Sequence, residues 1–133
     1  MSFKLIKCGG ESVPIVHGKL MTDSEGCTIH EALTESSGRL TKCAATSTPE
    51  YIAMATVALA ATSVTEVPLF RVTENMQFEV MSMATVASTV IGSKVTLHTD
   101  GLTITATTGS GVFYIDETDG VTTTSKCRGK FRR

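Results

Sequence analysis

Short stretches in which apolar and polar side chains alternate recur along this chain, and they predict β-strands. The clearest is EVPLFRVTENMQFEV, which covers Glu66–Val80. On each side of Thr73-Glu74-Asn75, successive side chains are expected to point to opposite faces, and aromatic and β-branched residues are frequent, as in half-buried strands. Asn tolerates left-handed backbone, so Asn75 suits a turn. The pattern predicts a β-hairpin over 66–80.

The last third of the chain shows a second strand-forming region. From residue 92 onward, short alternating runs are separated by turn residues: Asp100-Gly101, Gly109-Ser110-Gly111 and Asp119-Gly120. Asp-Gly and Gly-rich turns between alternating runs are typical of hairpins. The runs predict strands on both sides of Asp100-Gly101, over 112–115 and within 122–131. Regularly spaced short strands favour a small β-barrel or sandwich.

The first half is less regular. We expect strands over Cys27–Leu33 and Arg39–Cys43, joined by a tight turn at 35–38, with a short helix near residues 30–33 as the weaker alternative. Tyr51–Val57 alternates and follows Pro49, which favours a strand, although its Ala content also suits a helix. Residues 1–20 contain a Gly-Gly break and a proline, and they predict an extended N-terminal arm with a short strand near residues 13–16.

Composition agrees with an all-β fold. Of the 133 residues, 41% are hydrophobic and 19% charged, too apolar for a disordered chain. Thr is the commonest residue, and it clusters with Val and Ile, which pack well on pleated sheets. The length predicts one domain with a single core. We therefore expect a small all-β barrel or sandwich domain over 21–133, preceded by the extended arm over 1–20.

The sequence also gives expectations about compartment. The N-terminus MSFKLIKCGG lacks the apolar core of a signal peptide, and the longest uncharged run, Tyr51–Thr65, is shorter than the ~20 residues of a membrane helix. We expect a protein folded in a cytoplasm and no membrane partner. The four cysteines are widely separated, so we expect free thiols that are partly buried. Structural zinc sites usually show closely spaced ligand pairs, which this chain lacks.

Charge is unevenly distributed along the chain. The net charge is −1, yet the final eight residues, KCRGKFRR, carry five basic groups and no acid. These residues are either a solvated tail or a docking element for an acidic surface or nucleic acid. If they form a strand, their side chains alternate between faces, so only some reach one partner. Aromatic residues make up only 5% of the chain, which disfavours single-stranded nucleic acid as that partner.

The chain offers little catalytic chemistry. Its Gly-rich turns lack the spacing of a phosphate-binding loop. The sequence His30-Glu31 has no second His in the position a zinc-protease helix needs, because Thr34 occupies it. Asp100, Asp116, Glu117 and Asp119 are candidates for a cation site, but Asp-Gly turns explain two of them. We therefore expect no catalytic residues, no cofactor and no metal, and a protein that is not an enzyme.

The middle and end of the chain resemble the capsid decoration, or head-stabilising, proteins of tailed bacteriophages, which are small β-barrels. The matching stretches are EALTESSGRLTKC, TPEYIAM, EVPLFRVTENMQFEV, VIGSKVTLHTDGLTITATTGSGVFYIDETDG and SKCRGKF. The resemblance covers roughly residues 28–131 and depends on spacing and turn placement. It includes no catalytic motif, and the four cysteines and doubled C-terminal Arg are not part of the pattern.

The resemblance implies a non-enzymatic virion protein that is made in the host cytoplasm and binds the outer surface of a capsid. The implied partner is the major capsid protein, with self-association, a trimer first, as a further expectation. The other open functions are a head–tail connector or tail protein, and a nucleic-acid-binding β-barrel that uses the basic C-terminus. For capsid contact we expect the two ends of the chain: Phe3, Lys4, Leu5, Ile6, Lys7, Lys126, Arg128, Lys130, Arg132 and Arg133.

Overall fold

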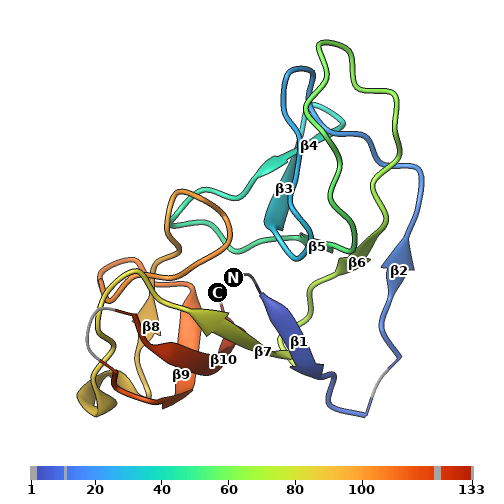
Figure 1. Ribbon diagram of the computed structural model, residues 1–133. Helices are drawn as coiled ribbons and strands as arrows, with labels where there is room; N and C mark the ends of the chain where they lie inside the picture. The colour runs from blue at the N-terminus through green and yellow to red at the C-terminus, as the bar shows by residue number, and fades with distance from the viewer. Residues whose placement is uncertain (1–2, 11, 122–123, 133) are drawn as a thin grey trace.

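A computed structural model describes residues 3–10, 12–121 and 124–132. In this part of the chain ten β-strands form two antiparallel five-stranded sheets, and a single 3-10 turn, η1 (Ser88–Val90), takes the place of any α-helix. Figure 1 shows one sheet at the lower left and the other at the upper right. The expected all-β single domain is confirmed, and neither sheet closes into a barrel.

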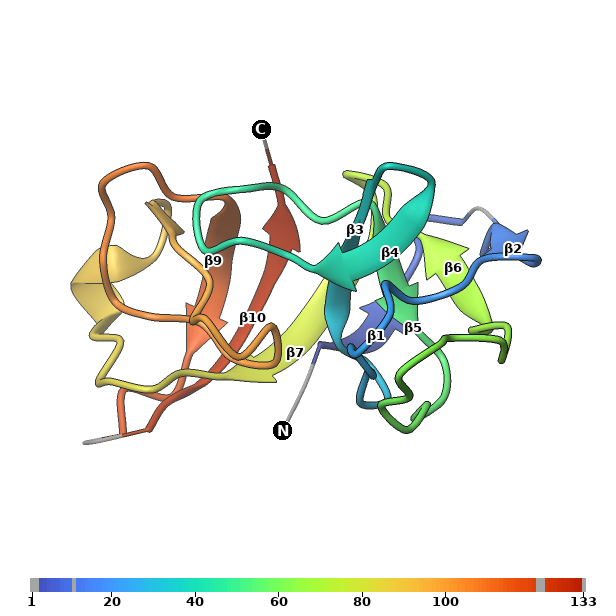
Figure 2. The same cartoon turned by 90° about the horizontal axis from the view of Figure 1, so that it is seen from above.

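Sheet A contains both ends of the described chain. Its strand order is β1 (Lys4–Lys7), β7 (Gln77–Met81), β10 (Lys126–Phe131), β9 (Phe113–Thr118) and β8 (Lys94–Val95). Sheet B has the order β2 (Ile15–Val16), β6 (Leu69–Arg71), β5 (Tyr51–Ala53), β3 (Ala32–Ser36) and β4 (Arg39–Lys42). Seen from above, the two sheets lie side by side along the long axis of the molecule (Figure 2).

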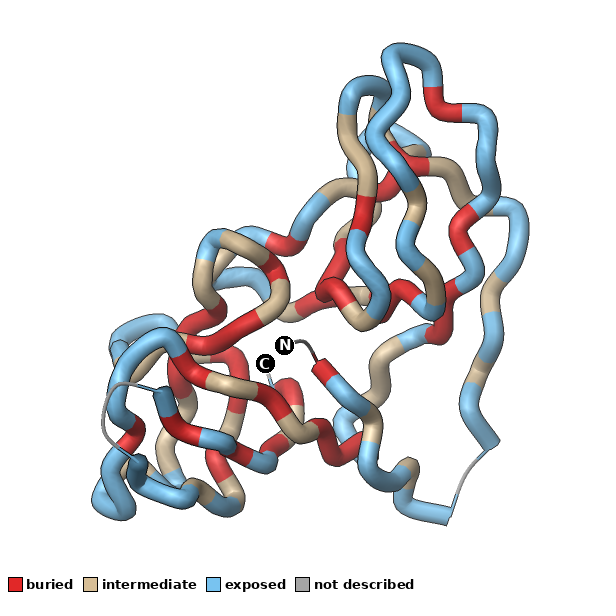
Figure 3. The backbone as a smooth tube through the Cα atoms, in the orientation of Figure 1, coloured by how far each residue is buried: buried red, intermediate tan, exposed pale blue. Residues whose placement is uncertain are grey.

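The main core lies between the two sheets. Sheet A contributes alternate residues of its strands, including Phe78, Phe113 and Phe131. The ring centroid of Phe131 lies 5.2 Å from that of Phe78 and 5.1 Å from that of Phe113. Sheet B contributes Ile52 and Phe70 to the same cluster. Buried segments are accordingly concentrated where the sheets face each other (Figure 3). Aromatic rings at such spacings add packing energy to the area that they bury.

A second, smaller cluster covers the other face of sheet B. Leu33, Tyr51 and Leu69 belong to it, although the neighbouring residues Ile52 and Phe70 belong to the main core. Successive side chains on a strand point to opposite faces, so a strand that is apolar throughout is buried on both sides. The centre of sheet B, where β5 is buried throughout, is therefore covered on both faces, while its edge strands β2 and β4 are partly exposed.

The predicted hairpin over 66–80 is wrong in its pairing. Both strands exist, but β6 belongs to sheet B and β7 to sheet A, so Val72–Met76 crosses between sheets. The rings of Phe70 and Phe78 still stack, with centroids 6.2 Å apart. The strands thus meet through their side chains across the core and not through backbone hydrogen bonds.

Residues 3–10 and 12–20 contain two short strands, and both are paired with the rest of the domain. β1 pairs with β7, and β2 pairs with β6. Phe3 is fully buried, and its ring is 5.0 Å from that of Phe131. Burying an aromatic side chain is worth a few kcal/mol, so in this structure the segment is part of the folded body and not a free arm.

Other expectations hold in part. The tight turn at 35–38 joins β3 to β4, with Ser37 and Gly38 at positive φ, as a two-residue hairpin turn requires. The expected strand over Cys27–Leu33 begins only at Ala32, and the one over Tyr51–Val57 ends at Ala53, although Cys27 and Val57 form an isolated bridge. Within the described residues, no helix is long and apolar enough to cross a membrane.

Candidate functional site: the basic face of sheet A

The outer face of sheet A brings the two ends of the chain together. β1 and β10 flank β7 on opposite sides, so residues 4–7 and 126–131 lie in one sheet, two strands apart. With Arg132, which follows β10, and Lys94 on β8, they form what we call the basic face: Lys4, Lys7, Lys94, Lys126, Arg128, Lys130 and Arg132. Neighbouring strands are about 4.8 Å apart, so these side chains cover one continuous surface.

Alternation along β10 explains why its charges share this face. Cys127, Gly129 and Phe131 are buried, whereas Lys126 and Arg128 are exposed and Lys130 is half-buried. Gly129 is required by close contact, because a Cβ there would lie 2.0 Å from the carbonyl oxygen of Tyr114. The strand therefore presents every second residue outward, and these are all basic.

One cross-strand row of this face is internally balanced. Lys4 pairs with Glu79 across β1 and β7, and Glu79 pairs in turn with Arg128 on β10. The Arg128 guanidinium lies 3.2 Å from the Glu79 carboxylate and 4.0 Å from that of Glu117. Arg128 thus has one acidic partner on each side, Glu79 and Glu117, which together neutralise its charge. This row therefore stabilises the sheet more than it attracts a partner.

The adjacent row is basic. Lys7 pairs with Gln77, and Lys130 lies in the next step of the β7–β10 ladder after Gly129 and Phe78. Lys130 and Lys94 both pair with Tyr114 of β9, from its two sides. Three lysines thus occupy every second strand, about 10 Å apart given the strand spacing. No ion pair of Lys7, Lys94 or Lys130 is found within the described residues.

Tyr114 adds an aromatic surface to this row. The Arg132 guanidinium lies over its ring, 4.9 Å from the centroid, in a cation–π contact. Asp116 also lies on this face, where its carboxylate accepts a hydrogen bond of 3.3 Å from the Gln77 amide. Seven basic and three acidic residues of the described chain therefore lie here, although the whole chain has a net charge of −1.

The expected contact residues divide into three groups. Lys4, Lys7, Lys126, Arg128, Lys130 and Arg132 share the basic face. Ile6 is the extra residue of a β-bulge in β1 and is 38% exposed at the sheet edge, while Leu5 points inward and packs on the core. The expectation for Phe3 does not hold: its side chain is fully buried in the core and does not reach the surface of this structure. Arg133 lies outside the described residues.

Sequence reasoning missed Lys94 and Tyr114. Each lies next to buried residues in a short strand, Lys94 beside Val95 and Tyr114 between Phe113 and Ile115. That alternation was a signal that both side chains point outward. What the sequence could not show is that β8 and β9 join the sheet that holds the chain ends, because this depends on long-range pairing.

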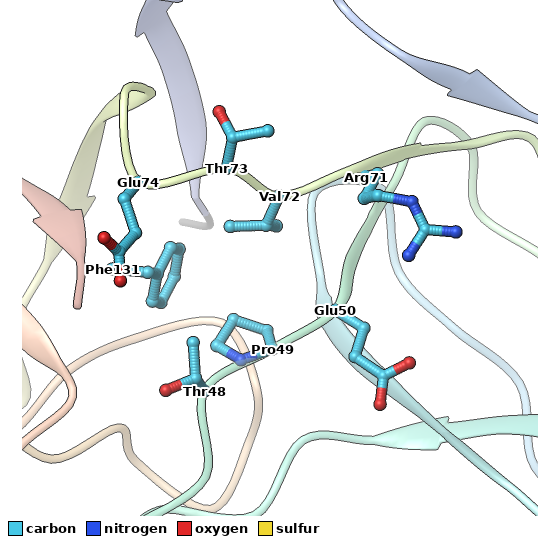
Figure 4. Close-up of a pocket in the computed structure, with 8 residues that line it drawn as sticks. All are labelled: Thr48, Pro49, Glu50, Arg71, Val72, Thr73, Glu74 and Phe131. Carbon is cyan, nitrogen blue, oxygen red and sulfur yellow. The ribbon is translucent and has the colours of Figure 1, made fainter. Parts of the chain in front are cut away.

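A pocket of about 360 Å³ lies between the sheets, beside the segment that crosses from β6 to β7. Pro49, Val72 and Phe131 form its apolar wall, while Glu50, Arg71 and Glu74 stand at its rim (Figure 4). Arg71 is already engaged, since its guanidinium lies over the Tyr51 ring and donates a 3.3 Å hydrogen bond to the Tyr51 hydroxyl. None of the residues that line the pocket belongs to the basic face.

The cysteines and acidic turns have structural partners. Cys27, Cys43 and Cys127 are buried and Cys8 is half-buried, all as free thiols. Burial raises the pKa of Cys43 to about 12. Asp100 accepts hydrogen bonds from the backbone of Leu102 and Thr103, as expected for a turn residue. Among the described residues, no three His, Cys, Asp or Glu side chains are grouped as they are around a metal ion.

Comparisons with models of protein families, with curated proteins and with solved structures found no match in any of the three.

Proposed function

We propose that this protein is a non-enzymatic virion component that binds the outside of a phage capsid through the basic face of sheet A and stabilises the shell. The observation that carries the proposal is the convergence of both expected contact segments, residues 4–7 and 126–132, on one surface. The sequence resemblance to decoration proteins supplies the class of partner. The structure supplies a positively charged surface for an acidic patch on that partner.

The chemistry of the face favours an acidic protein surface. Complementary charges steer association and fix the orientation of partners, and their effect falls with ionic strength. The row of Lys7, Lys130 and Lys94 is open to such a partner, whereas Arg128 is balanced by Glu79 and Glu117. We therefore assign the main contact to the lysine row and a minor one to Arg128.

The direct test uses capsids of the cognate phage that were expanded without this protein. The purified protein should co-sediment with these shells and raise the temperature at which they come apart. Replacing Lys7 and Lys130 together by Gln should weaken binding by about tenfold or more, at ~1 kcal/mol for each lost charge contact. Absence of both binding and a thermal shift would contradict the proposal.

A control variant distinguishes an effect of the protein's net charge from an effect of the charges on the basic face. Lys19 and Lys42 lie on the sheet B half of the molecule, so replacing both by Gln changes the net charge equally. Because Lys19 is ion-paired with Glu35 at 2.6 Å and Lys42 packs near Glu31, urea unfolding first checks that this variant keeps its fold. That control variant should bind shells like the unmodified protein. Equal loss of binding in both variants would show that net charge, and not this face, controls attachment.

Two other functions stay open as proposals. Electron microscopy with a labelled protein distinguishes a capsid surface position from a head–tail connector or tail position. Nucleic-acid binding is favoured by one observation, the Arg132–Tyr114 pair beside the lysine row. It requires affinity for an oligonucleotide that falls steeply with salt and disappears in the variant with Lys7 and Lys130 replaced.

A further inference from the structure

Glu31 is a buried carboxyl group at the place where the two halves of the molecule meet. Only 3% of the residue is exposed. Its Oε1 accepts a 3.1 Å hydrogen bond from the Thr28 backbone N–H, while Oε2 is buried and has no hydrogen-bond partner among the residues that the structure describes. A buried ionised carboxylate with an unsatisfied oxygen is costly, whereas the neutral acid is much less so.

The backbone around Glu31 joins three separate parts of the fold. The Phe3 N–H donates to the His30 carbonyl, which ties the N-terminal segment to this site. The next residue, Ala32, donates to the carbonyl of Gly101 in the turn beside sheet A, and accepts from Cys43 at the end of β4. Glu31 itself accepts a backbone hydrogen bond from Ala53 of β5. This site is the junction of the two sheets.

The turn packs closely on the Glu31 side chain. A Cβ placed on Gly101 would lie 3.1 Å from Cγ of Glu31 and 3.0 Å from Cγ of Lys42. Room for a charged carboxylate to gain new partners is therefore small. For an ionised side chain to reach water, this turn would have to separate from β3, which would break the hydrogen bond between Ala32 and Gly101.

Some groups around Glu31 raise the pKa of its carboxyl group and others lower it. Burial is the main influence and raises the pKa of Glu31 above its usual 4.5, and the negative charges of Glu25 and Asp100 raise it further. The Thr28 N–H and the Lys42 ammonium on β4 lower it, but not enough to reverse the shift. Asp100 is held ionised by its turn hydrogen bonds, with His98 3.5 Å away. Two further titratable neighbours are Cys27, whose thiol pKa is raised by burial, and His30, whose pKa is lowered mainly by burial.

We propose that Glu31 is a proton-operated latch: its neutral carboxyl keeps the junction between the two sheets closed, and its ionisation loosens that junction. A carboxyl group that binds its proton more tightly in the closed form favours that form at low pH. The stabilisation is complete below pH 4.5 and is lost as pH rises through the higher pKa of the closed form. Between the pKa of Glu31 in the open form and its higher pKa in the closed form, each rise of one pH unit lowers the population ratio of closed to open junction tenfold.

Opening of the junction at Glu31 would also affect the N-terminal segment. Phe3 precedes β1, the edge strand of sheet A, so an open junction also loosens the N-terminal anchor. Local openings of this kind are detected by amide hydrogen exchange long before global unfolding. The backbone amides of Phe3 and Ala32 report directly on hydrogen bonds that cross the junction, whereas the amide of Cys43 donates to Ala32 within sheet B and serves as a local reference.

The experiment measures amide protection at Phe3 and Ala32, with Cys43 as the reference within sheet B, between pH 4.5 and 8, corrected for the intrinsic exchange rate at each pH. In the unmodified protein, protection should fall about tenfold for each unit by which the Glu31 pKa exceeds 4.5, and then level off. The Glu31→Gln variant keeps the shape of the side chain without its charge, and its protection should not change with pH in this range. Glu66 is exposed, so a Glu66→Gln control should behave like the unmodified protein.

A carbon-13 NMR titration of the Glu31 carboxyl gives an independent readout on the intact protein. We expect a midpoint above 4.5, together with the loss of protection at the same pH. A midpoint at or below 4.5 overturns the latch. It is equally overturned if Glu31→Gln retains the full pH dependence of amide protection.

Discussion

The two sheets have equal strand numbers but opposite relations to solvent. Sheet A is apolar on one face and charged on the other, because residues such as Phe113 and Ile115 alternate with outward-facing Tyr114. The centre of sheet B is apolar on both faces, with Leu33 and Leu69 on one side and Ile52 and Phe70 on the other, although its edge strands β2 and β4 are partly exposed. An antiparallel sheet commonly exposes one face, so sheet B is the unusual member.

This difference assigns the two sheets different roles. A sheet whose centre is buried on both sides mainly supplies stability, and only its edge strands are open to a partner. Sheet A packs its apolar face on the shared core and leaves the basic face free. Partner contact is therefore expected on sheet A, while changes in sheet B should be felt as changes in stability.

The largest expected effect is at Phe3, whose ring contacts those of Phe78, Phe113 and Phe131. Phe3→Ala should lower the free energy of unfolding by about 3–5 kcal/mol, because it opens a cavity in the main core. Urea unfolding measures this. Ile6→Ala, at the exposed bulge of the same N-terminal strand, should cost about 1 kcal/mol or less. A small effect of Phe3→Ala would mean that the N-terminal segment is a detachable arm.

The next largest effects compare adjacent faces. Leu33→Ala and Ile52→Ala remove side chains from opposite faces of sheet B, and each should cost about 2–5 kcal/mol. On sheet A, Ile115→Ala should cost a similar amount, but Tyr114→Ala only about 1 kcal/mol, since that side chain is half-exposed. Thermal or chemical unfolding of the four variants decides the comparison. A mild Leu33→Ala would show that the second cluster is not a true core.

The smallest effect concerns the balanced row of the basic face. A double-mutant cycle on Arg128 and Glu79, measured by urea unfolding, should give a coupling of about 0.2–1 kcal/mol, as exposed ion pairs do. The coupling should shrink in high salt because mobile ions screen surface charges. A larger coupling that persists in salt would mean that this row is shielded from solvent, and the division of the face into balanced and open rows would then fail.

Strand formation was predictable in part from the sequence, whereas most strand pairing was not. The strands expected on both sides of Asp100-Gly101 are reduced to β8 and an isolated bridge between Leu97 and Ile104. Alternation located β9 and β10, and the turn at Ser37-Gly38 located the β3–β4 hairpin, because these signals are local. The segment over 66–80 shows the limit. Its two strands were correct, but nothing local determines whether the chain folds back on itself or crosses to another sheet. The stacking of Phe70 on Phe78 across the core is a tertiary preference that favours crossing.

The candidate site was predictable to the same extent. The basic residues of β10 were recognised, and their alternation correctly implied that only some share a face. Their joining with Lys4 and Lys7 depends on β1 and β10 both pairing with β7, between positions about fifty residues or more apart in the chain. Glu31 gave no local signal, because its burial depends on the turn at Gly101.

The four cysteines lie in different regions of the molecule, so their reactivity can report the local opening of each region. Cys8 is half-buried beside the N-terminal strand, whereas Cys27, Cys43 and Cys127 lie in the second cluster, the inter-sheet region and sheet A. A thiol-specific reagent should modify Cys8 rapidly and the other three only when their surroundings open, since buried thiols with raised pKa values form little thiolate. Mass spectrometry of the labelled peptides would then time the opening of each region separately, without any introduced probe.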